Sequence, residues 1–158
     1  IATFLNKVSA EEISESTSIK IKAMYKIIGE LESLGDSGET LSRILSRKNI
    51  HKKEFDSESI KNLNAMADTV SAAYDVMIEN LTAAHKGELV EISNAYNAED
   101  RLNTLRNNLR DSMIENIDSK GDNYQASVYF IDIINTYEQM GDFMINISQD
   151  LERAFVKK

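Results

Sequence analysis

The chain contains no proline in 158 residues and only six glycines, so very little in it would break a helix. Residue types that favour helices, such as alanine, leucine, glutamate, lysine and methionine, are plentiful. Apolar residues recur every three or four positions over long segments, which is the spacing of one helix face. No segment shows the two-residue alternation of apolar and polar residues that is typical of a strand. These features predict an all-α fold.

Four long helices are expected. The first begins at Ser9, because Ser9 and Glu12 match a capping box while Val8 and Ile13 occupy the positions of a hydrophobic staple. Asp56 is the expected N-cap of the second helix. The four helices are predicted over residues 9–47, 56–84, 89–117 and 123–155. The loop at 48–54 and the turns at 85–87 and 119–122 are short, and this favours a single domain, 1–158, folded as an up-down bundle of four long antiparallel helices.

The apolar stripes of these helices predict the core. In the first helix Gly38 falls on the same stripe and would allow close approach of another helix. Tyrosines on the stripes are interpreted as core residues. The predicted core positions are Met24, Ile27, Ile28, Leu31, Leu34, Leu41 and Leu45, then Ile60, Leu63, Ala67, Val70, Tyr74, Met77 and Leu81, then Leu89, Ile92, Tyr96, Leu102, Leu105, Leu109, Met113 and Ile117, then Phe130, Ile133, Tyr137, Met140, Met144, Ile147 and Leu151.

The pattern Glu-x-x-Gly-Asp occurs twice, at 32–36 and at 138–142. When residues 27–45 are compared with the residues 106 positions further along, seven are identical and the apolar stripes coincide. This indicates an internal duplication in which the first and fourth helices have equivalent roles.

The spacing of the signature has a chemical meaning. Its two carboxylates are four residues apart, so they emerge one turn apart on the same helix face, where like charges repel. A bound cation or a basic residue on a facing helix would offset the repulsion. The glycine before each aspartate costs roughly 0.5–1 kcal/mol relative to alanine, which suggests that something approaches the backbone there. The alternative is an ordinary solvated acidic face.

Composition excludes several kinds of function. The absence of cysteine excludes disulfides, cysteine-ligated zinc and thiol nucleophiles. A formal net charge of −8 disfavours nucleic acid and anionic lipid surfaces as partners. No apolar run approaches the ~18–20 residues that span a bilayer. No catalytic motif or phosphate-cradling glycine loop is present, so binding and regulation are expected rather than catalysis, without a small-molecule substrate.

Two further groups of residues are interpreted as structural. His51 and His85 lie in predicted loops and are expected to be solvated rather than to bind a metal. A basic cluster at the end of the first helix would complement the helix C-terminus, with contact to a membrane or phosphate as the alternative. The cluster consists of Arg43, Arg47, Lys48, Lys52 and Lys53.

At the repeated signature the sequence resembles the PhoU family. The third helix of each PhoU repeat carries Glu/Asp-x-x-x-Asp, often as Glu-Arg-Ile-Gly-Asp-His followed by Asn-Ile. Residues 138–142 match this pattern and are followed by Asn-Ile at 146–147, whereas the copy at 32–36 has Thr40 instead of the asparagine. The segment 55–151 is similar to one complete three-helix repeat, and the first helix resembles the last helix of a preceding one.

The closest resemblance is to the PhoU-like cytoplasmic C-terminal domain of bacterial sodium/phosphate (Na/Pi) cotransporters of the type II-related family. The sequence opens on Ile1, within apolar residues at helical spacing, so we expect a fragment of a longer membrane protein, with proteolytic processing as the competing explanation. The resemblance implies a regulatory domain on the cytoplasmic side of the inner membrane. Its expected partners are the membrane-embedded transporter region of the same chain and a second copy in a homodimer.

The resemblance also implies metal binding, because some PhoU-like domains hold iron or other metals through these carboxylates. Carried over, the ligands are Glu32, Asp36, Glu138 and Asp142, and oxygen ligands suit Fe, Mn, Mg or Ca. Separate sites would need further ligands, for which Asp75, Glu99 and Asp100 are weak candidates. Two alternatives stay open: a free-standing PhoU-type regulator of phosphate uptake, and a metal-free helical interaction or dimerisation module.

Overall fold

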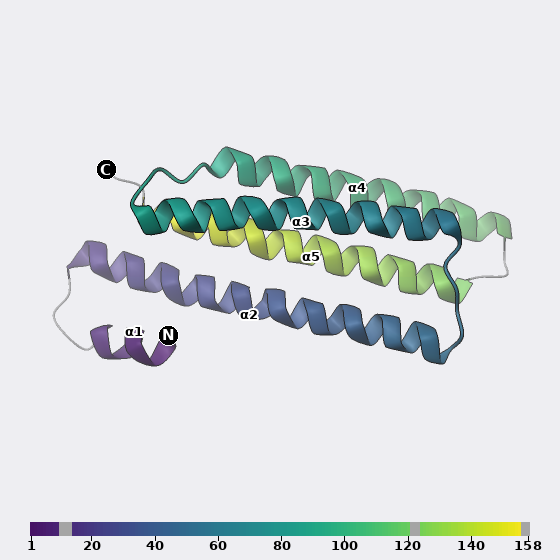
Figure 1. Ribbon diagram of the computed structural model, residues 1–158, viewed down its shortest axis with the longest axis horizontal. Coiled ribbons are helices and arrows are strands. Elements are labelled where there is room, and N and C mark those ends of the chain that lie inside the picture. The colour runs from purple at the N-terminus through teal and green to yellow at the C-terminus, as the bar shows by residue number, and fades with distance from the viewer. Residues whose placement is uncertain (10–13, 121–123, 156–158) are drawn as a thin grey trace.

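The chain folds into five helices and no strand over the part that the structure describes (Figure 1). This computed structural model describes residues 1–9, 14–120 and 124–155, with side chains for all of these except 116–120. The prediction of an all-α fold is therefore confirmed. The helices are α1 (Ala2–Ser9), α2 (Glu15–Ile50), α3 (Ser57–Lys86), α4 (Ile92–Lys120) and α5 (Tyr124–Phe155).

The start of the first long helix differs from the prediction. Ser9 is the last residue of α1, and its hydroxyl donates to the carbonyl oxygen of Leu5 at 2.9 Å. The N-cap of α2 is Ser14, whose Oγ accepts from the backbone N–H of Thr17 at 3.2 Å. The other members of the expected capping box and staple, Glu12 and Ile13, lie outside the described residues. The capping-box prediction at Ser9 was wrong because a second serine five residues on provides the cap.

The boundaries of α3 follow the local signals in the sequence. Asp56 is the N-cap, and its Oδ1 accepts from the backbone N–H of Ser59 at 2.7 Å. Gly87 closes the helix in the left-handed conformation, with φ of 72°, which suits glycine. The prediction of Asp56 as the N-cap is confirmed. The turn predicted at 85–87 is shorter than expected, because His85 and Lys86 form the last turn of α3 and only Gly87 leaves the helix. The next helix begins later than expected, at Ile92, and Leu89 before it is exposed. The expected turn at 119–122 lies partly outside the described residues, since α4 runs to Lys120.

Helix α5 is the centre of the fold. It packs against α2, α3 and α4, while α3 and α4 also pack against each other. Figure 1 shows the four long helices alternating in direction, with α2 along one edge of the molecule. Within the described residues the backbone of α2 comes close only to α5 and α1, and not to α3. The arrangement is therefore a three-helix bundle with α2 added on one face of α5, rather than a bundle in which each helix packs on both neighbours.

This arrangement leaves part of the predicted core uncovered. Met24, Leu31 and Leu45 of α2 are 38%, 41% and 44% exposed. Ile60 and Tyr74 of α3 are likewise exposed, because α2 does not cover them. Tyr96 of α4 was also predicted to be core and is exposed, although its hydroxyl accepts a hydrogen bond from Gln149 of α5. These positions lie on the apolar stripes as expected, but no neighbouring helix covers that part of each stripe.

The remaining stripes do form the core. The main cluster joins α3, α4 and α5, and Ile27 of α2 completes it. A second cluster lies near the α2–α3 loop, where Ile44 of α2 packs with Tyr129 and Ile133 of α5. The largest fully buried apolar side chains are Phe130, Met66, Met77, Leu102, Ile134 and Ile147.

The basic cluster at the end of α2 contains one structural lysine. Lys48 was predicted to start the loop, but it lies inside α2 and is buried. Its Nζ donates to the carbonyl oxygen of Lys53 at 2.9 Å, forms an ion pair with Glu54 at 3.6 Å and lies over the ring of Phe55. The neighbouring His51 was expected to be solvated only, yet its Nδ1 is hydrogen-bonded to the hydroxyl of Tyr129. The contacts of Lys48 fix the end of α2 against the α2–α3 loop, and the contact of His51 fixes it against α5.

Candidate functional site

The second copy of the signature, on α5, is built into the contact with α4. Glu138 forms an ion pair with Arg106 of α4, and both side chains are mostly buried, at 19% and 18% exposure. A charge-assisted hydrogen bond of this kind is stronger than a neutral one. A basic residue on a facing helix therefore offsets the charge of Glu138, which was one of the two ways expected to relieve the acidic pair.

The glycine of this copy allows α4 to approach α5 closely. A Cβ atom added to Gly141 would lie 3.1 Å from Cδ1 and 3.3 Å from Cδ2 of Leu102, closer than ordinary van der Waals contact. Leu102 is fully buried and cannot move aside without disturbing the core. The glycine in the signature thus accommodates a leucine of the neighbouring helix.

The aspartate of this copy is in an unfavourable environment for a charge. The pKa of the Asp142 carboxyl is raised above its ordinary value, first by burial and then by the negative charges of Glu138 and Glu99. The positive charge of Arg106 acts in the opposite direction. Arg106 therefore stands among three acidic groups at the α4–α5 contact.

The first copy of the signature, on α2, has the opposite surroundings. Glu32 and Asp36 are exposed, and neither side chain forms an ion pair or hydrogen bond within the described part of the chain. A Cβ atom added to Gly35 would have no other atom within 4 Å. The same five-residue pattern is thus a helix-packing element on α5 and an uncovered surface on α2.

The predicted metal ligands are not gathered into one centre. Across the described ranges, no group of three or more His, Asp or Glu side chains is placed to hold a metal ion. Of the weak candidates, Asp75 and Asp100 are exposed, and Glu99 accepts a hydrogen bond from Asn103 at 3.1 Å. With Glu138 engaged by Arg106, the residues as placed do not fit a shared four-carboxylate site.

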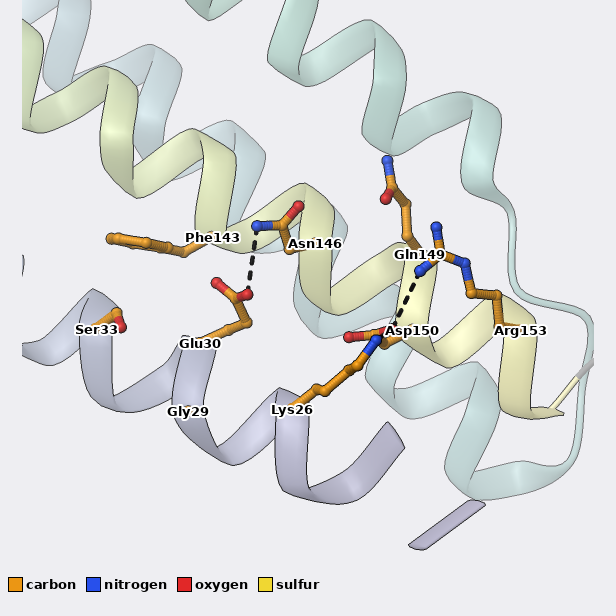
Figure 2. Close-up of a pocket in the computed structure, with 9 residues that line it drawn as sticks. All are labelled: Lys26, Gly29, Glu30, Ser33, Phe143, Asn146, Gln149, Asp150 and Arg153. Atoms are coloured by element: carbon orange, nitrogen blue, oxygen red, sulfur yellow. Dashed lines mark hydrogen bonds and ion pairs between the residues drawn. The ribbon is translucent and has the colours of Figure 1, made fainter. Parts of the chain in front are cut away.

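A pocket of about 500 Å³ lies between the N-terminal half of α2 and the C-terminal half of α5 (Figure 2). Asp150 is buried at its base and pairs with Lys26 at 3.6 Å and with Arg153 at 3.4 Å. Nearby, Asn146 donates to Glu30 at 3.4 Å. The two cations and two anions that line the pocket compensate each other, which leaves no excess charge to select an ionic ligand.

A second pocket of about 510 Å³ lies at the other end of the same helix pair. The residues that line the second pocket correspond to those that line the first when 106 is added to the numbers of the α2 residues. The α2 residues of the first pocket, at 26, 29, 30 and 33, map to 132, 135, 136 and 139, which are the α5 residues of the second. Conversely, its α2 residues at 40, 43, 44 and 47 map to 146, 149, 150 and 153 in the first. Helices α2 and α5 are therefore related by an approximate twofold axis that exchanges them.

One buried polar network was not visible from the sequence. Ser148 of α5 is fully buried, and its Oγ accepts from Nδ2 of Asn80 of α3 at 3.1 Å. The same amide donates to Oδ1 of Asn94 at 3.2 Å. A buried asparagine side chain needs such partners. Ser148 is one of the seven residues that are identical at the offset of 106, and its counterpart, Ser42, is exposed.

No model of a known protein family matches the chain, and neither a curated protein nor a solved structure matches it. No described helix is both long and apolar enough to cross a membrane.

Proposed function

We propose that this chain is a PhoU-like regulatory domain that acts by binding other protein elements. In this proposal it is the cytoplasmic domain of a sodium-dependent phosphate cotransporter and regulates phosphate uptake through contact with the membrane-embedded region. A free-standing PhoU-type regulator, acting on a separate transporter, would use the same surfaces.

One observation carries the proposal: α2 and α5 contain the same signature and pair about an approximate twofold axis. Such a pairing supports a duplicated helical repeat, which is what the resemblance to PhoU proteins implies. In the copy that the fold covers, the glycine admits Leu102 and the glutamate pairs with Arg106. Both are packing contacts between helices, and they give this copy of the signature a structural role in the proposed repeat.

The ion pair between Arg106 and Glu138 favours a second candidate, a helical interaction module that functions without metal. The guanidinium of Arg106 already supplies the positive charge that a metal ion would bring to Glu138. Metal binding through Glu138 and Asp142 would require Arg106 to share or leave this position. The metal-free form is therefore the one that the contacts support better.

The test of the proposed function is sodium-dependent uptake of radiolabelled phosphate by cells. One strain expresses the complete gene and another expresses it without residues 1–158, with equal transporter levels verified in the membrane. We expect the rate, or its response to external phosphate, to differ between the strains. Equal uptake at low and high phosphate would contradict a regulatory role. A gene without transmembrane helices before Ile1 would leave only the free-standing regulator, tested by deleting its gene.

A further inference from the structure

The second pocket between α2 and α5 carries an excess of positive charge. Arg43 and Arg47 of α2 line one wall, Asp132 of α5 lies on the other, and the remaining lining residues are uncharged. The first pocket, by contrast, is lined by two cations and two anions. Because the whole chain has a formal net charge of −8, a pocket with two guanidinium groups and one carboxylate stands out from the rest of the surface. The second pocket is therefore a candidate site for an anion.

The offset of 106 shows which residues create the difference between the two pockets. Both acids of the first pocket have uncharged counterparts in the second, since Asp150 corresponds to Ile44 and Glu30 to Thr136. In the first pocket Asp150 lies between two cations and neutralises them (Figure 2). Arg43 adds a cation where the first pocket has a glutamine. The arginines of the second pocket thus lack the buried acid that their counterparts have.

The charged side chains of the second pocket are free to meet a ligand. Arg47 forms no ion pair with any residue that the structure describes. Arg43 pairs only with Glu39 of its own helix, at 3.8 Å and with both side chains exposed, and such a pair contributes little. Asp132 forms no ion pair with either arginine in the described ranges, although all three line the same pocket. A ligand between the two walls can therefore contact both signs of charge at once.

The uncharged side chains supply both donors and acceptors. The amides of Asn135 and Gln139 have no hydrogen-bond partner among the described residues, so both can donate to an anion. The hydroxyls of Thr40 and Thr136 already donate to backbone carbonyl oxygens of their own helices, at 3.0 and 2.8 Å. Their oxygens are left as acceptors. The pocket thus matches a ligand that has several negatively charged oxygens and also a proton to donate.

We propose that the second pocket binds inorganic phosphate in its monoprotonated form. Arg43 and Arg47 bind its charged oxygens through guanidinium N–H groups, which suit the geometry of phosphate. The carboxylate of Asp132 accepts the hydrogen bond from the remaining P–OH group. This inference deepens the proposed function by naming the ligand to which regulation responds, and it rests on the proposed function for that biological role.

The carboxylate gives the pocket a means of selecting among anions. Sulfate has the shape of phosphate but carries no proton at neutral pH, so Asp132 can only repel it. A phosphate monoester has lost its last proton above a pH of about 6, and is repelled in the same way. Inorganic phosphate keeps one proton throughout the neutral range. A charge that would weaken binding of any other dianion therefore favours this one.

An NMR titration of the 158-residue protein tests the binding. The methyl signals of Ile44 report on the site, because this residue is buried in the wall of the pocket. The titrants are inorganic phosphate, sulfate and methyl phosphate at neutral pH, with the ionic strength held constant by chloride. We expect a saturable shift with phosphate and a Kd on the order of 1 mM, as suits a small ligand at an open site. The Kd for sulfate and for methyl phosphate should be about ten-fold higher.

Three variants assign the binding to the pocket. Arg47→Gln should weaken phosphate binding about five-fold, whereas Arg153→Gln, the equivalent change in the first pocket, should leave it unchanged. Asp132→Asn should bring the Kd values of sulfate and phosphate to within about two-fold of each other, because the proton acceptor that repels sulfate is gone. A purely structural role of Asp132 would not change this ratio.

Several results would overturn the proposal. The first is a phosphate titration that does not saturate, and the second is equal affinity for the three titrants, which would show an adventitious ion only. A loss in Arg153→Gln as large as in Arg47→Gln would mean that net charge governs binding. An Asp132→Asn variant that keeps the preference for phosphate would remove the basis of the selectivity. The uptake experiment is independent: phosphate binding without any effect on uptake would contradict the proposed function and leave the site in place.

Discussion

Leu102 of α4 lies directly over Gly141 of α5, with its Cδ1 only 3.1 Å from the position that a Cβ on the glycine would occupy. The equivalent glycine of α2, Gly35, has no atom within 4 Å of that position. The two glycines therefore have the same sequence context and opposite surroundings, which makes them matched controls for each other.

Alanine at each glycine should change stability in opposite directions. Gly141→Ala forces Leu102 out of its packing, and overpacking of about 1–3 kcal/mol exceeds the gain in helix propensity, so the free energy of unfolding should fall. Gly35→Ala introduces no clash and should raise it by roughly 0.5–1 kcal/mol. Urea denaturation of the two variants measures both effects. Equal changes of the same sign would mean that Leu102 does not lie against Gly141 in solution.

Removal of Arg106 should destabilise the protein more than removal of its partner. Arg106→Met leaves the charge of Glu138 without its cation, beside Asp142 and Glu99, and should cost about 1–3 kcal/mol after allowing for the remaining exposure. Glu138→Gln removes one of the repelling charges and should cost less. A double-mutant cycle by thermal unfolding gives the coupling between the two residues. Additive effects would show that the ion pair is not formed.

Asp142→Asn should stabilise the protein at neutral pH. Burial and the neighbouring acids raise the pKa of Asp142 in the folded state, so folding favours its protonated form. Asp142 contributes to the free energy of unfolding most fully below the pKa that it has in the unfolded chain. This contribution is lost as the pH rises through the raised pKa of the folded state. The asparagine variant keeps a neutral group at all pH values, and we expect its Tm at pH 7 to exceed that of the native chain by roughly 1–3 °C.

The difference should shrink as the pH is lowered to about 4 and below, where the aspartate is itself protonated. Asp36→Asn, on the exposed copy, is the control, and its Tm at pH 7 should match that of the native chain. A lower Tm for Asp142→Asn at pH 7 would indicate that the carboxylate has a cationic partner in solution, such as a metal ion.

Metal content tests the implication of the family resemblance separately. Protein purified without a His tag should contain no stoichiometric Fe, Mn, Mg or Ca, and a chelator should leave its Tm unchanged, because Arg106 supplies the positive charge at Glu138. Elemental analysis makes the measurement. A bound metal that disappears in Glu138→Gln would restore the carboxylate ligand assignment and show that Arg106 moves away on binding.

The sequence predicted where the helices lie in the chain better than it predicted which helices pack against each other. Asp56 was identified as the start of α3 because an N-cap depends on local backbone geometry, whereas the turn predicted at 85–87 was placed two residues too early. Met24 and Leu31 were misjudged because helical periodicity identifies an apolar face but not whether another helix covers it.

In the candidate site, the offset of 106 identified the two equivalent helices, while the difference in their surroundings came only from the tertiary structure. The contacts of Arg106 depend on the rotation and depth of α4 against α5. Buried Asp150 gave no signal at all, since only its pairing with Lys26 and Arg153 explains a charge beside Leu151.

Because α3 and α4 do not pack on α2, this helix can detach from α5 without breaking the contacts among α3, α4 and α5. Its amide hydrogens should therefore exchange through local opening, faster than those at the centre of α5. A ligand that bridges α2 and α5 would suppress this opening and slow the exchange. Binding to α2 would then raise the free energy needed to open the contact between α2 and α5, while the average structure stays the same.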